Sequence, residues 1–88
     1  MAQVLIYSTA ACPYCQAADR LLERKGVSDI ERVRVDLEPA RRAEMRQKSG
    51  RSTVPQIWIG GRHIGGSDEL HELDDSGQLD QLLLAKAP

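Results

Sequence analysis

The only two cysteines of this 88-residue chain, Cys12 and Cys15, lie three positions apart with Pro13 and Tyr14 between them. Residues three apart on a helix have Cβ atoms about 5 to 6 Å apart, so a small adjustment at the first turn permits a disulfide. The pair can therefore open and close without unfolding the chain. Cys12 precedes a predicted helix, whose free N–H groups and dipole stabilise an anion. We expect Cys12 to be largely thiolate at neutral pH, and Cys15, one turn inside the helix, to stay protonated until it attacks.

Two other uses of the cysteines are weaker. A structural disulfide that closes a four-residue ring would stabilise the fold by only about 2 kcal/mol, against about 4.7 kcal/mol for a 100-residue loop. A zinc site would need His63 and His71, which are eight positions apart in different predicted elements. Structural zinc sites usually bring their histidines as a closely spaced pair. We therefore predict a redox pair and no metal site.

The residues around the cysteines predict a βαβ unit. An apolar run over residues 3–7 predicts a first, central strand that is buried on both faces. Helical periodicity begins at Pro13 and ends at Gly26. The apolar face of this helix consists of Tyr14, Ala18, Leu21 and Leu22. Residues 32–37 alternate, which predicts a half-exposed strand whose inner face is Val33, Val35 and Leu37. A crossover of this kind is right-handed and joins parallel strands.

A second helix and a hairpin follow. The helix opens at Glu38-Pro39 and ends at Gly50, and its thin apolar stripe is Ala40, Ala43 and Met45. Residues 55–59 and 62–64 predict two antiparallel strands, because Gly60-Gly61 between them is a two-residue turn signal.

The last part of the chain predicts two short helices. Ser67 is the expected N-cap of the first, which runs towards Gly77. The stripe of the last helix is Leu79, Leu82 and Leu83.

Composition limits the class of protein. An apolar fraction of 41% in 88 residues is enough for one globular domain, which we predict over residues 1–88. Twelve Lys and Arg against thirteen Asp and Glu give a net charge of −1, so nothing favours binding to nucleic acid. The apolar runs are far shorter than the roughly 20 residues of a membrane span, and there is no signal-peptide pattern. We expect a cytoplasmic protein with no membrane partner.

Three motifs in this order resemble the dithiol glutaredoxins of bacteria: Cys12-Pro13-Tyr14-Cys15, Thr53-Val54-Pro55 before a strand, and Gly65-Gly66-Ser67-Asp68 opening a helix. The resemblance covers nearly the whole chain. It implies an α/β thioredoxin fold, a four-stranded mixed sheet of βαβ then ββα order flanked by helices. It also implies a monomeric enzyme, a glutathione-dependent thiol–disulfide oxidoreductase. Its partners would be glutathione, as reductant and co-substrate, and glutathionylated or disulfide-containing proteins, with no bound cofactor.

The resemblance assigns the reacting groups and the cysteinyl subsite. Cys12 would be the nucleophile and Cys15 the resolving thiol. Pro55 would be cis, and the backbone of Val54, after Thr53, would pair with the cysteinyl part of glutathione like an added strand. Tyr14 would shield the disulfide or simply pack.

The resemblance also assigns the charged ends of glutathione, which carry two carboxylates and one ammonium. The backbone N–H groups of Gly66 and Ser67 would hold the γ-glutamyl carboxylate at a helix N-terminus, and Asp68 would pair with the ammonium. Arg42 would bind the glycyl carboxylate. The alternatives are a solvated helix face for Arg42 and an ordinary first-turn charge for Asp68.

This sequence departs from the family at two positions. Thr9 stands where members commonly carry a lysine, and Ser67 stands where many carry a third cysteine. Two rival functions stay open. One is an electron donor served by thioredoxin reductase, which the glutathione-binding groups disfavour. The other is a carrier of a glutathione-ligated iron–sulfur cluster, which Pro13 disfavours because it stiffens the turn.

Overall fold

The computed structural model describes residues 2–84 and contains a four-stranded sheet of order β2-β1-β3-β4. Strand β1 (Val4–Ser8) pairs in parallel with β2 (Ile30–Arg34) and antiparallel with β3 (Gln56–Ile59), which pairs antiparallel with β4 (Arg62–Gly65). This is the mixed sheet of the thioredoxin fold, so the predicted fold class is confirmed. The two ends of the predicted domain, residue 1 and residues 85–88, lie outside the described residues.

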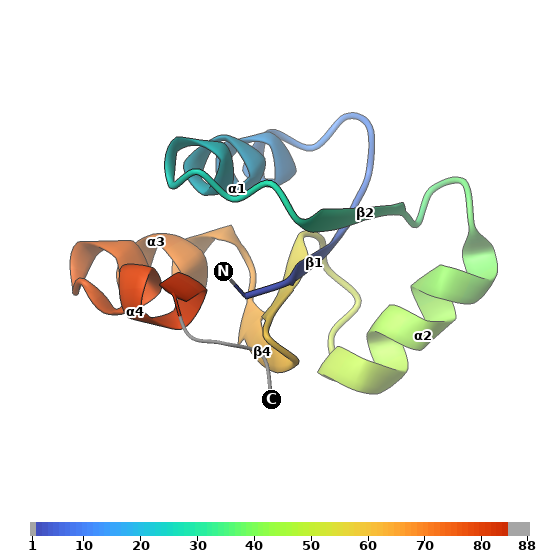
Figure 1. The fold of residues 1–88 in the computed structure, drawn as a ribbon. Helices are drawn as coiled ribbons and strands as arrows, with labels where there is room; N and C mark the ends of the chain where they lie inside the picture. The colour runs from blue at the N-terminus through green and yellow to red at the C-terminus, as the bar shows by residue number, and fades with distance from the viewer. Residues whose placement is uncertain (1, 85–88) are drawn as a thin grey trace.

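Helices cover both faces of the sheet (Figure 1). Helices α1 (Pro13–Arg24), α3 (Ser67–Asp75) and α4 (Gln78–Leu84) lie on one face, and α2 (Pro39–Ser49) lies on the other. The larger core joins the first face to the three helices through Val4, Ile6, Ala18, Leu21, Leu22, Ile57, Ile59, Leu70, Leu79 and Leu83, among others. Strand β1 is central and buried on both faces, as predicted, because Val4 and Ile6 point into this core while Tyr7 points into the other.

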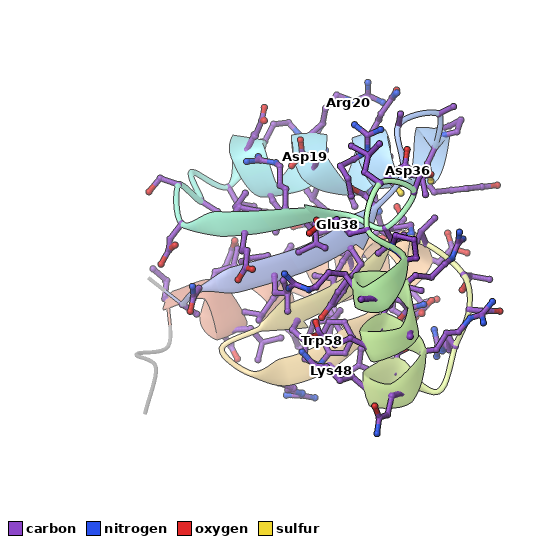
Figure 2. All side chains as sticks on the ribbon, turned by 90° about the vertical axis from the view of Figure 1, so that its right-hand side faces the viewer. Asp19, Arg20, Asp36, Glu38, Lys48 and Trp58 are labelled. Atoms are coloured by element: carbon purple, nitrogen blue, oxygen red, sulfur yellow. The ribbon has the colours of Figure 1, made fainter. Side chains whose placement is uncertain are left out.

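Helix α2 is attached to the sheet by one buried residue, Met45, which joins the second core with Tyr7, Val33, Val35 and Trp58. The predicted stripe was wrong for Ala40 and Ala43, which are exposed. A charged side chain of α2 packs on aromatic rings of the sheet instead: Lys48 Nζ lies 4.7 Å from the Trp58 ring centroid and 5.6 Å from that of Tyr7. Figure 2 shows Lys48 and Trp58 close together beside this helix.

The second strand ends earlier than the alternation predicted. Val33 and Val35 are buried as expected, but Leu37 is 69% exposed. The chain turns after Arg34. The Leu37 N–H donates to the Arg34 carbonyl, and the Arg34 guanidinium donates two hydrogen bonds to the Asp36 carboxylate. A turn breaks the two-residue period, so Leu37 no longer faces the core.

Two helix starts differ from the predictions. Tyr14 is 65% exposed, and Cys15 takes its place on the buried face of α1. Cys12 is the N-cap of that helix, so the inward positions three and six residues later are Cys15 and Ala18. In α3 the N-cap is Gly66 and Ser67 is the first helical residue, because the Glu69 carboxylate accepts the Gly66 N–H.

The glycine signals were correct. Gly26 and Gly50 have φ of 80° and 71° just after α1 and α2, and Gly60 and Gly61 have φ of 58° and 82° in the hairpin turn. Within residues 2–84, none of the helices combines the length and the apolarity needed to cross a membrane.

Candidate active site

Cys12 stands where β1 passes through a turn into α1. Its backbone is extended, with φ −129° and ψ 102°, and its sulfur accepts the Cys15 N–H at 3.2 Å while Pro13 fills the first helical position. The sulfur is thus the side-chain cap of the helix, and a backbone N–H points at it. A thiolate is favoured by such a donor and by the positive end of the helix dipole.

The Cys12 sulfur also lies against the second motif. It is 3.9 Å from the carbonyl oxygen of Val54, and the Val54–Pro55 peptide bond is cis, as the resemblance implied. Cys12 is 8% exposed, twice the exposed fraction of Cys15.

Cys15 is the more deeply placed thiol, at 4% exposure. Burial raises its pKa to about 12, with a further contribution from its hydrogen bond to Cys12. Both cysteines are free, so the structure is that of the dithiol. Cys15 is a thiol at neutral pH, as predicted.

An open cleft of about 200 Å³ adjoins the Cys12 sulfur through Val54. Its lining contains seven of the eight predicted glutathione-binding residues: Tyr14, Thr53, Val54, Pro55, Gly66, Ser67 and Asp68. Three segments far apart in the sequence therefore meet at one cleft, at the start of α1, before β3 and at the start of α3.

The eighth predicted residue, Arg42 on α2, does not line this cleft. Its Nε is buried, and within residues 2–84 no acceptor pairs with it. The cleft instead contains a different cation, Arg51, together with Gln56 and Glu69, none of which was predicted to belong to the site.

Glu69 changes the role of Gly66. One carboxylate oxygen of Glu69 accepts the Gly66 N–H at 2.9 Å and Arg51 Nη1 at 2.7 Å. These two donors, the Gly66 N–H first, hold the pKa of Glu69 below its ordinary value. The Gly66 N–H is thus occupied, which leaves the Ser67 N–H as the predicted backbone donor to an anion. Gly65 must be glycine, since its φ is 116° and an added Cβ would collide with the Glu69 side chain.

The Gln56 side chain is hydrogen-bonded to the loop before β3. It is fully buried, and its amide nitrogen donates to the Thr53 carbonyl at 3.1 Å and to Thr53 Oγ1 at 3.2 Å. Its amide oxygen pairs with His63 Nε2 at 2.8 Å, so His63 carries its proton on that nitrogen. Burial, and then the charge of Arg51, lowers the pKa of His63. A polar residue inside the predicted apolar strand 55–59 was the signal that could have identified Gln56.

The two histidines of the zinc alternative lie against other groups. His63 pairs with Gln56, and His71 Nδ1 lies 2.7 Å from the Ser67 carbonyl oxygen. Within residues 2–84, no three His, Cys, Asp or Glu side chains gather in a way that could hold a metal ion.

The chain is similar to known proteins over most of its length. The Glutaredoxin family model matches residues 4–64. A glutaredoxin of Pseudomonas aeruginosa is 54% identical over 85 residues, 97% of this chain and 100% of that protein. Glutaredoxin 3 of Escherichia coli K12 is 52% identical over 83 residues, 94% of this chain and 99% of that protein. The crystal structure of a buckwheat glutaredoxin–glutathione complex superimposes with a TM-score of 0.85 at 32% identity, covering 93% of this chain and 76% of that chain. The chain therefore belongs to the glutaredoxin family of glutathione-dependent thiol–disulfide oxidoreductases, and Cys12 with Cys15 makes it a dithiol member.

Proposed function

We propose that this glutaredoxin reduces two kinds of substrate: glutathione mixed disulfides through Cys12 alone, and protein disulfides through Cys12 and Cys15 together. The observation that carries the proposal is the place of the Cys12 sulfur, between the Cys15 N–H and the Val54 carbonyl at the edge of the cleft. The sulfur is held by a donor that stabilises the thiolate, and it lies beside backbone that an extended peptide can pair with.

With a glutathione mixed disulfide, the Cys12 thiolate attacks the glutathionyl sulfur and the target leaves as a thiol. A second glutathione then attacks the Cys12 adduct, releases oxidised glutathione and restores the thiolate. Cys15 takes no part in this cycle.

With a protein disulfide, the Cys12 thiolate forms a mixed disulfide with one sulfur of the target and frees the other. Cys15 then attacks Cys12, releases the reduced target and leaves a Cys12–Cys15 disulfide, which glutathione reduces. The raised pKa of Cys15 suits this order, since a protonated Cys15 does not compete with Cys12 for the first attack.

We further propose how the cleft holds glutathione. The Val54 backbone pairs with the cysteinyl residue, beside Thr53, Pro55 and Tyr14. The Ser67 N–H holds the γ-glutamyl carboxylate, and Asp68, exposed in the first turn of α3, pairs with the ammonium. Gly66 acts as the N-cap that positions these groups.

Arg42 is the proposed cation for the glycyl carboxylate. Its support is the family position, together with an Nε that pairs with no acceptor among residues 2–84, since a guanidinium binds a carboxylate through charge-assisted hydrogen bonds. The buckwheat relative was crystallised as a glutathione complex, which supports glutathione as the ligand of this cleft as well.

We propose that residues 1–88 act as one domain and as a monomer in the cytoplasm. All of the proposed groups come from one chain, and the cycle needs a compartment in which glutathione keeps thiols reduced.

The test is a coupled assay on a small glutathione mixed disulfide with glutathione, glutathione reductase and NADPH. We expect turnover that Cys12→Ser abolishes. Turnover with thioredoxin reductase and NADPH, but not with glutathione, would replace the proposal by the reductase-served donor. A coloured, cluster-bearing protein after anaerobic purification, inactive in the assay, would replace it by the cluster carrier.

A further inference from the structure

Cys15 borders a second, smaller cavity that shares no lining residue with the glutathione cleft. It has about 110 Å³ and is open to solvent, which is ample space for water. Its lining comes from β1, the turn after it, α1 and β2: Ile6, Ser8, Thr9, Cys15, Gln16, Asp19 and Arg32. The buried resolving thiol therefore has a polar route to solvent that does not pass through the bound substrate.

Asp19 is the only carboxylate among these lining residues. It lies one helical turn after Cys15 on α1, so the two side chains project from the same side of the helix. Figure 2 shows Asp19 reaching from α1 towards β2. There its Oδ1 accepts a hydrogen bond from Arg32 Nε at 2.9 Å and forms an ion pair with Arg32 Nη2, also at 2.9 Å. The ion pair joins α1 to β2 beside the cavity, and the Asp19 side chain remains 34% exposed.

The resolving step needs a proton acceptor at this place. Cys15 is 4% exposed and protonated, and it must lose its proton as its sulfur attacks. We propose that Asp19 accepts the Cys15 proton, through water in this cavity, when Cys15 attacks the mixed disulfide on Cys12. This inference rests on the proposed role of Cys15 as the resolving thiol.

The step balances as follows. The Cys15 S–H bond breaks, and its proton passes through water to the Asp19 carboxylate. The Cys15 sulfur forms a bond to Cys12 Sγ, and the bond between Cys12 Sγ and the target sulfur breaks. The target leaves as a thiolate and is reduced, the cysteine pair is oxidised, and Asp19 returns its proton to solvent.

The local charges support this assignment. Two of the causes that raise the Cys15 pKa, the hydrogen bond to Cys12 and the charge of Cys12, end when Cys12 enters a disulfide. Burial, the largest cause, remains in the mixed disulfide. The charged groups on the cavity are Asp19 and Arg32, with Glu23 beyond, 3.5 Å from Arg32 Nη2.

If Asp19 has only a structural role, the expected effect of its removal on the rate of Cys15 attack is the opposite. If the carboxylate only ties α1 to β2, its negative charge disfavours a Cys15 thiolate nearby, and removing it would speed the attack. If Asp19 accepts the proton, removing it slows the attack. The sign of the change in rate therefore separates the two roles.

The test uses the intact protein and an aromatic disulfide that releases a coloured thiolate, followed by stopped flow. Attack by Cys12 releases the first coloured thiolate in a phase that depends on disulfide concentration. Attack by Cys15 releases the second in a concentration-independent phase. We expect Asp19→Asn to slow the second phase at least tenfold, since general base catalysis contributes about 10²- to 10⁴-fold. The first phase should change less than about twofold, and the slowed phase should accelerate steadily as the pH is raised.

Two variants serve as controls. Arg32→Gln breaks the same ion pair but keeps the carboxylate, and its second phase should stay within about threefold of the parent. Cys15→Ser should lack the second phase; if it keeps that phase, the resolving role itself is wrong. An unchanged or faster second phase in Asp19→Asn, or an equal slowing in Arg32→Gln, would overturn the role of Asp19 and leave that of Cys15 standing.

Discussion

The backbone N–H of Cys15 donates to the sulfur of Cys12 across 3.2 Å, so the proposed resolving residue also holds the sulfur of the proposed nucleophile. The hydrogen bond comes from the main chain, and a substitution of the Cys15 side chain leaves it in place. The hydrogen bond that residue 15 donates to Cys12 and its proposed role in resolving Cys12 adducts can therefore be separated by mutation.

The first prediction concerns these two functions. Cys12→Ser should abolish the reduction of both glutathione mixed disulfides and protein disulfides. Cys15→Ser should retain the first activity, because the N–H remains, and should lose the intramolecular step of the second. The measurement is the coupled assay on each type of substrate. A Cys15→Ser variant that cannot reduce glutathione mixed disulfides would show that the one-sulfur cycle is wrong.

The second prediction concerns the ammonium of glutathione. Asp68→Ala should raise the KM for glutathione by a factor of about 5 to 30, equivalent to about 1 to 2 kcal/mol, because a charge-assisted hydrogen bond is lost. The thermal stability should change little, since Asp68 is exposed. The matched control is Asp75→Ala, an exposed aspartate at the far end of the same helix. Equal effects of the two substitutions would mean that only the charge of α3 matters.

The fold could be predicted from local signals because they agreed with one another. The apolar run of β1, the glycines at the ends of α1 and α2, and the Gly60-Gly61 turn each specify local geometry. The prediction failed where a local pattern met a long-range constraint. Leu37 continues the apolar alternation in the sequence, but the chain turns at the Arg34–Asp36 pair and Leu37 is exposed. Tyr14 continues the apolar stripe of the helix, but with Cys12 as the N-cap the buried face begins at Cys15 and Tyr14 is exposed.

The motif residues of the site could be predicted, whereas their supports could not. Gln56 and Thr53 are near neighbours, but Arg51 and Glu69 are eighteen positions apart and meet only because β3 and β4 bring the chain back. Nothing local in the sequence pairs them. Arg42 is the reverse case: its role is proposed from a family position, and it is the one predicted glutathione-binding residue that does not line this cleft.

The third prediction concerns Gln56. Gln56→Leu removes both hydrogen bonds to Thr53 and leaves the His63 N–H without its acceptor. We expect the KM for glutathione to rise severalfold while alkylation of Cys12 keeps its rate, because the loop before β3 is loosened and the helix cap is not. The free energy of unfolding should fall by about 1 to 3 kcal/mol, the cost of unpaired buried polar groups.

His63→Phe is the control for that substitution. It keeps the amide bonds to Thr53 and the ring packing on Trp58, whose centroid lies 4.6 Å from that of His63. The KM for glutathione should then stay near that of the parent. If His63→Phe raises it as much as Gln56→Leu does, the support comes from the packing of β4 and not from the Gln56 amide.

The fourth prediction concerns acid stability and the turn beside the active-site loop. The Arg34 guanidinium, bonded to Asp36 at 2.6 and 2.8 Å, and then the backbone N–H groups of Asp36 and Ala10, lower the Asp36 pKa to about 2. A carboxylate whose pKa is lower in the folded state stabilises the fold above its ordinary pKa, and this contribution is lost as the pH falls towards the folded value. Asp36→Asn should therefore be less stable than the parent near pH 6, and the difference in free energy of unfolding should shrink between about pH 4 and pH 2.

Urea unfolding across this pH range measures the difference, with Asp75→Asn as the exposed control. A difference that stays constant down to about pH 2 would show that the asparagine disturbs the turn itself and that the charge pair with Arg34 contributes nothing.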